Sequence, residues 1–202
     1  MSMSIYRIVL GEQFILLHPM LQKRYEFPFK ASGVMKTING GPKWLYPLFL
    51  AGVRFKLLFP EHGENIPFSI HNTLRTGVNG EEQVHWERVF HFNNKKRYFN
   101  ALMSMDSKEG MIKDYLGEPK LFYSDLSFKA GDQGQLIITS KKQRLLVGKL
   151  EIPMPKWLQG LATVRESYNE KRDVFQIKVD VYNPIIGNVF SYEGEFTTDE
   201  IA

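Results

Sequence analysis

Residues 84–92 place an arginine among aromatic residues at alternate positions. Trp86, Arg88 and Phe90 are each two residues apart, so in a β-strand their side chains project from one face. A buried guanidinium is costly unless it is paired with an acid, stacked on a ring or bound to an anionic ligand. Arg88 is therefore the first candidate to anchor a ligand, with Trp86 and Phe90 beside it.

Three further side chains are candidates to lie near Arg88. Glu166 and Asp114 belong to other expected strands, and either acid would neutralise Arg88 in a structural ion pair. Two such carboxylates on opposed strands could instead carry out acid–base catalysis or glycoside hydrolysis. Tyr192 would add a hydroxyl group to a pocket. The ligand-binding candidates are thus Arg88, Trp86, Phe90, Glu166, Tyr192 and Asp114, and no residue is assigned as catalytic.

Other common chemistries lack the residues that they need. The sequence has no cysteine, which excludes disulfides, thiolate nucleophiles and cysteine-bound zinc. His85 and His91 share a strand face, but they would be roughly 20 Å apart along it, too far for one metal ion. No Gly-x-Ser-x-Gly nucleophile motif is present. We expect neither a metal nor a cofactor.

The elements that must position these residues are mostly strands. The chain has 202 residues, with 15 Phe, 9 Tyr and 3 Trp, a length and aromatic content that suit one β-rich domain over 1–202. From residue 66 apolar and polar residues alternate between short turns, which favours sequential antiparallel hairpins. We expect an α+β, mainly antiparallel fold, a curved sheet or half-barrel of about ten strands. The expected strands are 66–74, 84–92, 97–104, 111–115, 121–128, 136–139, 145–152, 161–168, 174–182 and 188–196.

The N-terminal portion, residues 1–60, is expected to supply two or three helices that pack on a sheet over 66–196. Ser4 can cap a helix over 5–10, and Pro19 can begin another over 19–25. Residues 42–59 form an amphipathic stretch that mixes aromatic side chains with Lys and Arg, the composition of an interfacial helix. That stretch could close the sheet as a core helix, or act as a lid in peripheral contact with a membrane.

The charge balance and the N-terminus bear on partners and location. The 26 basic residues are interleaved with 22 acidic ones, and no nucleic-acid-binding motif is present, so we expect no nucleic-acid partner. The N-terminus lacks the pattern of a signal peptide, so we expect a cytoplasmic protein. The sequence does not indicate an oligomeric state.

Several patches, taken in order, resemble the bacterial domain-of-unknown-function family numbered 4166. They are Val-Leu-Gly at 9–11, Leu-His-Pro at 17–19, Trp-Glu-Arg-Val-Phe at 86–90, Ile-Pro-Met-Pro-Lys-Trp-Leu at 152–158, Arg-Glu at 165–166, Val-Phe at 174–175, Pro-Ile-Ile-Gly at 184–187 and Tyr-Glu-Gly at 192–194. The resemblance implies no activity. Family members occur alone, after membrane segments or after a nicotinamide-dependent reductase-like domain, and neither appendage is expected here. Where the family tends to have Glu, this chain has Asp114, and the shorter acid weakens a catalytic role there.

Three functions follow from these features. The leading hypothesis is a module that binds a small apolar or lipid-like, amphiphilic ligand in a β-sheet cavity, with Arg88 as its polar contact. The second is an enzyme that uses inward carboxylates together with Arg88. The third is a structural or protein-interaction domain without a ligand.

Overall fold

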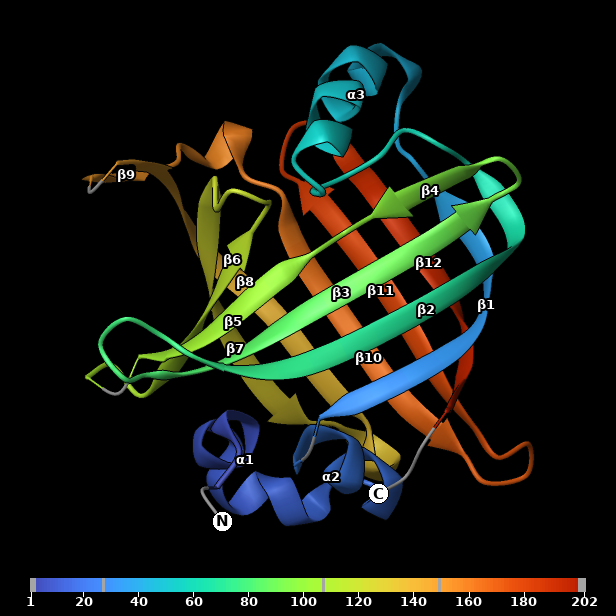
Figure 1. The fold of residues 1–202 in the computed structure, drawn as a ribbon, viewed down its shortest axis with the longest axis vertical. Helices are drawn as coiled ribbons and strands as arrows, with labels where there is room; N and C mark the ends of the chain where they lie inside the picture. Colours follow the sequence, from blue (N-terminus) through green and yellow to red (C-terminus); the bar gives the residue numbers. More distant parts are fainter. Residues whose placement is uncertain (1–2, 27, 107, 149, 200–202) are drawn as a thin grey trace.

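The alternating sequence folds into one antiparallel sheet that closes on itself (Figure 1). The computed structural model describes residues 3–26, 28–106, 108–148 and 150–199. Ten strands form the barrel, and β4 and β9 lie outside that circuit. The strands are β1 (Phe29–Asn39), β2 (Gly63–Thr76), β3 (Glu82–Phe92), β4 (Lys95–Tyr98), β5 (Ala101–Asp106), β6 (Met111–Leu116), β7 (Phe122–Ala130), β8 (Leu136–Val147), β9 (Leu150–Pro153), β10 (Leu161–Asn169), β11 (Val174–Asn183) and β12 (Gly187–Thr198).

Closure depends on two strand pairs. β1 pairs with β12, so the first and last strands of the chain lie side by side, and β8 pairs with β10 across the β9 insertion. Closing the circuit satisfies the edge hydrogen bonds that a half-barrel would leave open. The curved antiparallel sheet is therefore confirmed, and its closed form is a barrel. The sheet begins earlier than expected, because β1 lies within residues 1–60 and joins it.

Three expected strands are divided differently in the structure. β4 and β5 pair with β3 in one continuous register, but the expected strand 97–104 is interrupted at Phe99 and Asn100. By contrast, the expected strand 136–139 and the first part of the expected strand 145–152 form one strand. β8 runs without a break to Val147, and the remainder of 145–152 belongs to β9. On one edge, β8 changes its partner along its length, from β10 at Leu136–Thr139 to β9 at Arg144–Val147.

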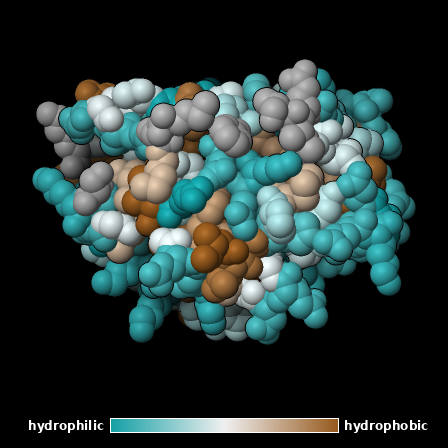
Figure 2. Space-filling view, turned by 90° about the horizontal axis from the view of Figure 1, so that it is seen from below, coloured by the Kyte–Doolittle hydropathy of each residue, from teal (hydrophilic) through white to brown (hydrophobic). Residues whose placement is uncertain are grey.

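Short helices cover one end of the barrel, here called the lower end. They are α1 (Ile5–Leu10), the 3₁₀ helix η1 (Gly11–Leu16) and α2 (Pro19–Glu26). The expected cap is present, because the Ser4 hydroxyl accepts a hydrogen bond from the Arg7 amide. Inward side chains such as Phe14 and Leu21 are fully buried, whereas the outer face of this end is mostly hydrophilic, with small separate hydrophobic areas (Figure 2).

At the opposite, upper end the chain forms the 3₁₀ helix η2 (Lys43–Leu45) and α3 (Tyr46–Arg54). The expected helix over 42–59 is shorter than its pattern suggested. The helix ends because Lys56 adopts a left-handed conformation with φ 51°. The backbone carbonyls at this point accept hydrogen bonds from the barrel instead of from the next helical turn. The Lys56 carbonyl accepts from the Asn100 amide, and the Phe55 carbonyl accepts from the Glu118 amide. The two remaining 3₁₀ turns are η3 (Asp132–Gly134) and η4 (Lys156–Leu158).

A fully buried ion pair fastens the lower helices to the sheet. Arg24 of α2 donates from Nε and Nη2 to the two carboxylate oxygens of Glu166 on β10, at 2.8 and 2.9 Å. The guanidinium carbon lies 4.4 Å from the centre of the Phe29 ring and 4.9 Å from that of Phe196. The charges are thus compensated by a bidentate partner and by aromatic faces.

The Arg24–Glu166 pair predicts a large stability effect. Glu166→Gln keeps the side-chain shape but leaves the Arg24 charge buried without a counter-charge, so we expect a loss of about 3–5 kcal/mol in the free energy of unfolding. Urea denaturation measures it. Lys178→Gln, which breaks the exposed Lys178–Glu193 pair, is the control and should cost less than about 1 kcal/mol. Equal, small losses from both changes would show that the buried pair does not hold the lower end.

Candidate functional site

Arg88 points into the barrel from the middle of β3 and is buried. Its Nε donates to the Phe99 carbonyl at 2.7 Å, and its Nη1 donates to the Tyr192 hydroxyl at 3.3 Å. The guanidinium also stacks on Phe99, 4.1 Å from the ring centre. The break between β4 and β5 therefore has a local role, since it places the carbonyl and the ring of Phe99 against Arg88.

Arg88 has no carboxylate within ion-pair distance among the residues that the structure describes. Glu166, one of the two acids considered as its partner, is bound to Arg24 instead. The other, Asp114, acts on Arg88 electrostatically but without a direct ion pair. A neutral carbonyl and a neutral hydroxyl thus solvate the buried cation, which has no direct ion pair among the described residues.

Asp114 lies on the inner face of β6, between Met103 of β5 and Ser124 of β7. Its Oδ1 atom is buried and has no hydrogen-bond partner among the described residues. Burial raises the pKa of the Asp114 carboxyl to about 6, and the positive charge of Arg88 opposes that rise. Next along the wall, the Gln143 amide donates to the Ser124 hydroxyl at 3.0 Å, so this part of the interior is polar.

The aromatic candidates belong to the packed part of the interior. The indole N–H of Trp86 donates to the Tyr6 hydroxyl of α1 at 2.7 Å, which ties β3 to the lower helices. Phe90 packs against Phe59 and Tyr192, with ring centres 5.0 and 5.2 Å apart. Trp86 and Phe90 thus form the wall around Arg88, and Tyr192 supplies both a ring and a hydroxyl.

The two ends of the inner wall differ in exposure. At the lower end most inward residues are buried beneath the helices, with Ala130 and Tyr168 partly exposed, whereas several inward residues at the upper end of β6, β7 and β10 are partly exposed. These are Leu116, Phe122, Ala162 and Val164. The inner face then continues beyond the barrel on a hairpin of β8 and β9, because Leu145 lies opposite both Phe122 and Ile152. The exposed apolar face of this rim hairpin consists of Leu145, Val147, Leu150 and Ile152.

Two surface hollows lie elsewhere. One, of about 300 Å³, lies between the lower helices and the ends of β2 and β3, with Arg24, Tyr25 and Asn72 in its lining. The other, of about 520 Å³, lies beside α3. Neither lining includes Arg88, Asp114 or Tyr192, so these two hollows are separate from the candidate site.

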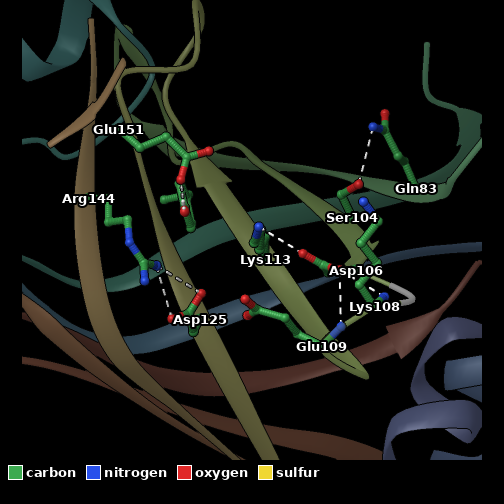
Figure 3. A network of polar contacts seen from close by, with 10 residues as sticks. Gln83, Ser104, Asp106, Lys108, Glu109, Lys113, Asp125, Arg144 and Glu151 are labelled. Atoms are coloured by element: carbon green, nitrogen blue, oxygen red, sulfur yellow. Dashed lines mark hydrogen bonds and ion pairs between the residues drawn. The ribbon is translucent and has the colours of Figure 1, made fainter. Parts of the chain in front are cut away.

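The acids on the outer face of β5–β9 are occupied by partners. Figure 3 shows Asp106 paired with Lys113 and Asp125 paired with Arg144, at 2.8 and 3.2 Å. Glu151 accepts from the Tyr123 hydroxyl. These contacts give the carboxylates a structural role on the barrel wall. In the described ranges, no three His, Asp or Glu side chains come close enough to bind one metal ion, and no helix is long and apolar enough to span a membrane.

The sequence did not single out Arg24, which binds Glu166, or Phe99, which contacts Arg88. A signal for Arg24 existed, because it lies three residues after Leu21 and next to Tyr25, on the face of α2 that is buried. Phe99 had no comparable signal. Its role depends on the interruption between β4 and β5, which the alternation of residues 97–104 does not reveal.

Comparisons with known proteins give a family and a relative. Residues 17–196 match the domain of unknown function DUF4166. The chain is 43% identical over 189 residues to the uncharacterised protein YndH of Bacillus subtilis (strain 168). The aligned region covers 92% of each of the two chains. No solved structure was found to match the chain.

The raised pKa of Asp114 predicts a pH-dependent stability. The folded protein holds the Asp114 proton more tightly than the unfolded chain, so ionisation of this group lowers stability as the pH rises from about 4 to 6. Asp114→Asn should therefore raise the free energy of unfolding at pH 7.5 by on the order of 1–3 kcal/mol, with little gain at pH 4. Urea denaturation at both pH values measures the difference.

Asp106→Asn is the control for this experiment. Lys113 lowers the pKa of Asp106, so the same chemical change there should reduce stability at pH 7.5. A lower stability of Asp114→Asn than of the natural protein at pH 7.5 would contradict the prediction.

Proposed function

The chain belongs to the domain of unknown function family DUF4166, whose description gives no activity, and we propose from the geometry of the barrel that it binds a small amphiphilic molecule. The observation that carries the proposal is Arg88. This buried guanidinium has a hydroxyl, a carbonyl and the rings of Phe99 and Trp86 around it but no carboxylate within ion-pair distance among the described residues. An anionic group of a ligand would supply the missing charge.

A carboxylate is the head group that this arrangement suits best. It can accept hydrogen bonds from the Arg88 guanidinium and from the Tyr192 hydroxyl at the same time. Asp114 then acts as a modulator, since its negative charge would repel a ligand carboxylate. Because the pKa of Asp114 is about 6, the affinity for such a ligand should rise as the pH falls through that value.

The apolar part of the ligand would lie toward the upper end. The lower end is closed by buried helix side chains, whereas Leu116, Phe122 and Val164 line a half-exposed inner wall. The rim hairpin extends that wall outward, so a chain running from Arg88 to the hairpin would meet apolar surface. Each methylene group buried there contributes about 0.8 kcal/mol.

The catalytic alternative has weaker support from the geometry. A carboxylate pair needs two acids that are free to exchange protons or attack a substrate, as in glycoside hydrolysis. Glu166 is held in a bidentate ion pair with Arg24, which leaves Asp114 as the inward acid without a direct ion pair. A single carboxyl beside Arg88 favours binding of a ligand over hydrolysis by two acids.

Ligand binding is tested with matched lipids. Thermal shift and calorimetry should show that dodecanoic acid binds and that dodecanol, which has the same chain without the charge, binds about tenfold or more weakly. Native mass spectrometry of the purified protein should reveal a retained acidic amphiphile.

Variants of the site separate binding from folding. Arg88→Gln should lower the affinity for dodecanoic acid by about 10–100-fold, and the milder Tyr192→Phe should lower it by several-fold. Each change removes a hydrogen-bond donor to the ligand carboxylate. Arg165→Gln, an exposed change on β10, is the control. Equal binding of acid and alcohol to the natural protein would contradict an anionic head group, even if Arg88→Gln failed to fold.

A further inference from the structure

We propose that the upper end of the barrel docks on an anionic membrane surface through two apolar elements on either side of its mouth. One element is η2 and α3, and the other is the rim hairpin with η4; both lie at the end opposite the lower helices (Figure 1). The proposal names a partner for the proposed amphiphile-binding site but does not depend on the chemistry at Arg88.

Each element exposes a tryptophan and large aliphatic side chains. Trp44 is 66% exposed and Trp157 is 57% exposed, although neither position is near a chain end. Indole rings with adjacent aliphatic groups are enriched where proteins meet the interfacial region of a bilayer. The remaining exposed apolar residues are Tyr46, Leu48 and Leu50 on α3, and Leu145, Val147, Leu150, Ile152 and Leu158 on the rim hairpin and η4.

The charges at this end fit an anionic surface. Lys43 and Arg54 flank α3, Lys156 begins η4, and all three are exposed and form no ion pair with the described residues. Of the acids at the same end, Glu118 accepts from Lys56 and Glu61 accepts from Arg97, whereas Glu64 and Glu151 are exposed and form no ion pair with the described residues. Lys43, Arg54 and Lys156 outnumber these two acids, so the balance of unpaired charge among these residues is positive. This sign selects an anionic bilayer over a second copy of the chain, which would bring the same cations together.

The rim hairpin also connects the proposed docking surface with the inner wall of the barrel. The apolar face of the rim hairpin is continuous with the inner wall of the barrel, because Leu145 is opposite Phe122. A membrane in contact with Trp44 and Trp157 would meet that face directly. A lipid-derived amphiphile could then pass from the bilayer along the hairpin without its apolar part crossing water.

Vesicle sedimentation tests the docking surface. The protein should pellet with vesicles of phosphatidylcholine and phosphatidylglycerol at 3:1, and binding should weaken at 0.5 M NaCl and with pure phosphatidylcholine. Trp44→Ser and Trp157→Ser should each reduce binding about tenfold, and Lys156→Glu at least about fivefold. These side chains are exposed, so the fold should be retained, as circular dichroism can verify.

Two controls separate this proposal from others. Leu16→Ser makes the same kind of change at the lower end and should leave vesicle binding unaltered. The Arg88→Gln variant should also bind vesicles normally, although its affinity for dodecanoic acid is reduced. A failure of the ligand site can therefore be distinguished from a failure of membrane docking. The proposal is overturned if no vesicle pellets the protein, if both tryptophan variants bind as the natural protein does, or if light scattering shows a dimer that Trp157→Ser dissociates.

Discussion

The buried ion pair between Arg24 and Glu166 is the contact on which the lower half of the structure depends. It joins a short helix to a strand of the barrel, and its guanidinium lies among the rings that fill the lower interior. Helices of six and eight residues are too short to be stable alone, so their position comes from such tertiary contacts. With the lower end sealed in this way, the upper end is the side on which the inner wall reaches solvent.

The two buried arginines show how one side-chain type can serve different purposes. Arg24 has a bidentate carboxylate and aromatic faces, and its charge is fully compensated within the protein. Among the described residues, Arg88 has neutral acceptors and lies over the rings of Phe99 and Trp86, with Asp114 acting from further away. A buried cation without a direct ion pair lowers stability, which is consistent with the binding role that we propose for Arg88.

Much of the sheet was predictable, because strand alternation is a local property. The inner faces of β3, β11 and β12 follow from it, as do Arg88 and Tyr192 as inward residues. Tyr192 was expected near Arg88 and is hydrogen-bonded to it, but the Arg24 partner of Glu166 and the Phe99 partner of Arg88 were not predictable. Glu166 meets Arg24 because α2 folds beneath β10, and Arg88 bonds to the Phe99 carbonyl because the strand is interrupted between β4 and β5. Such contacts depend on how distant segments pack, which neither alternation nor spacing records. The same reason explains why alternation predicted a curved sheet but not whether that sheet closes into a barrel.

The pairing of β1 with β12 has a consequence for how the chain reaches this structure. Ala31 lies opposite Thr198, so the seam of the barrel joins segments from near the two ends of the sequence. Contacts of such long sequence separation form late and slow the folding of β-rich proteins. During synthesis the seam must wait until β12 has left the ribosome, and until then the edges of β1 and β11 remain unpaired. A nascent chain of this family therefore carries two open sheet edges through most of its translation, which makes chaperone protection relevant to its yield in cells.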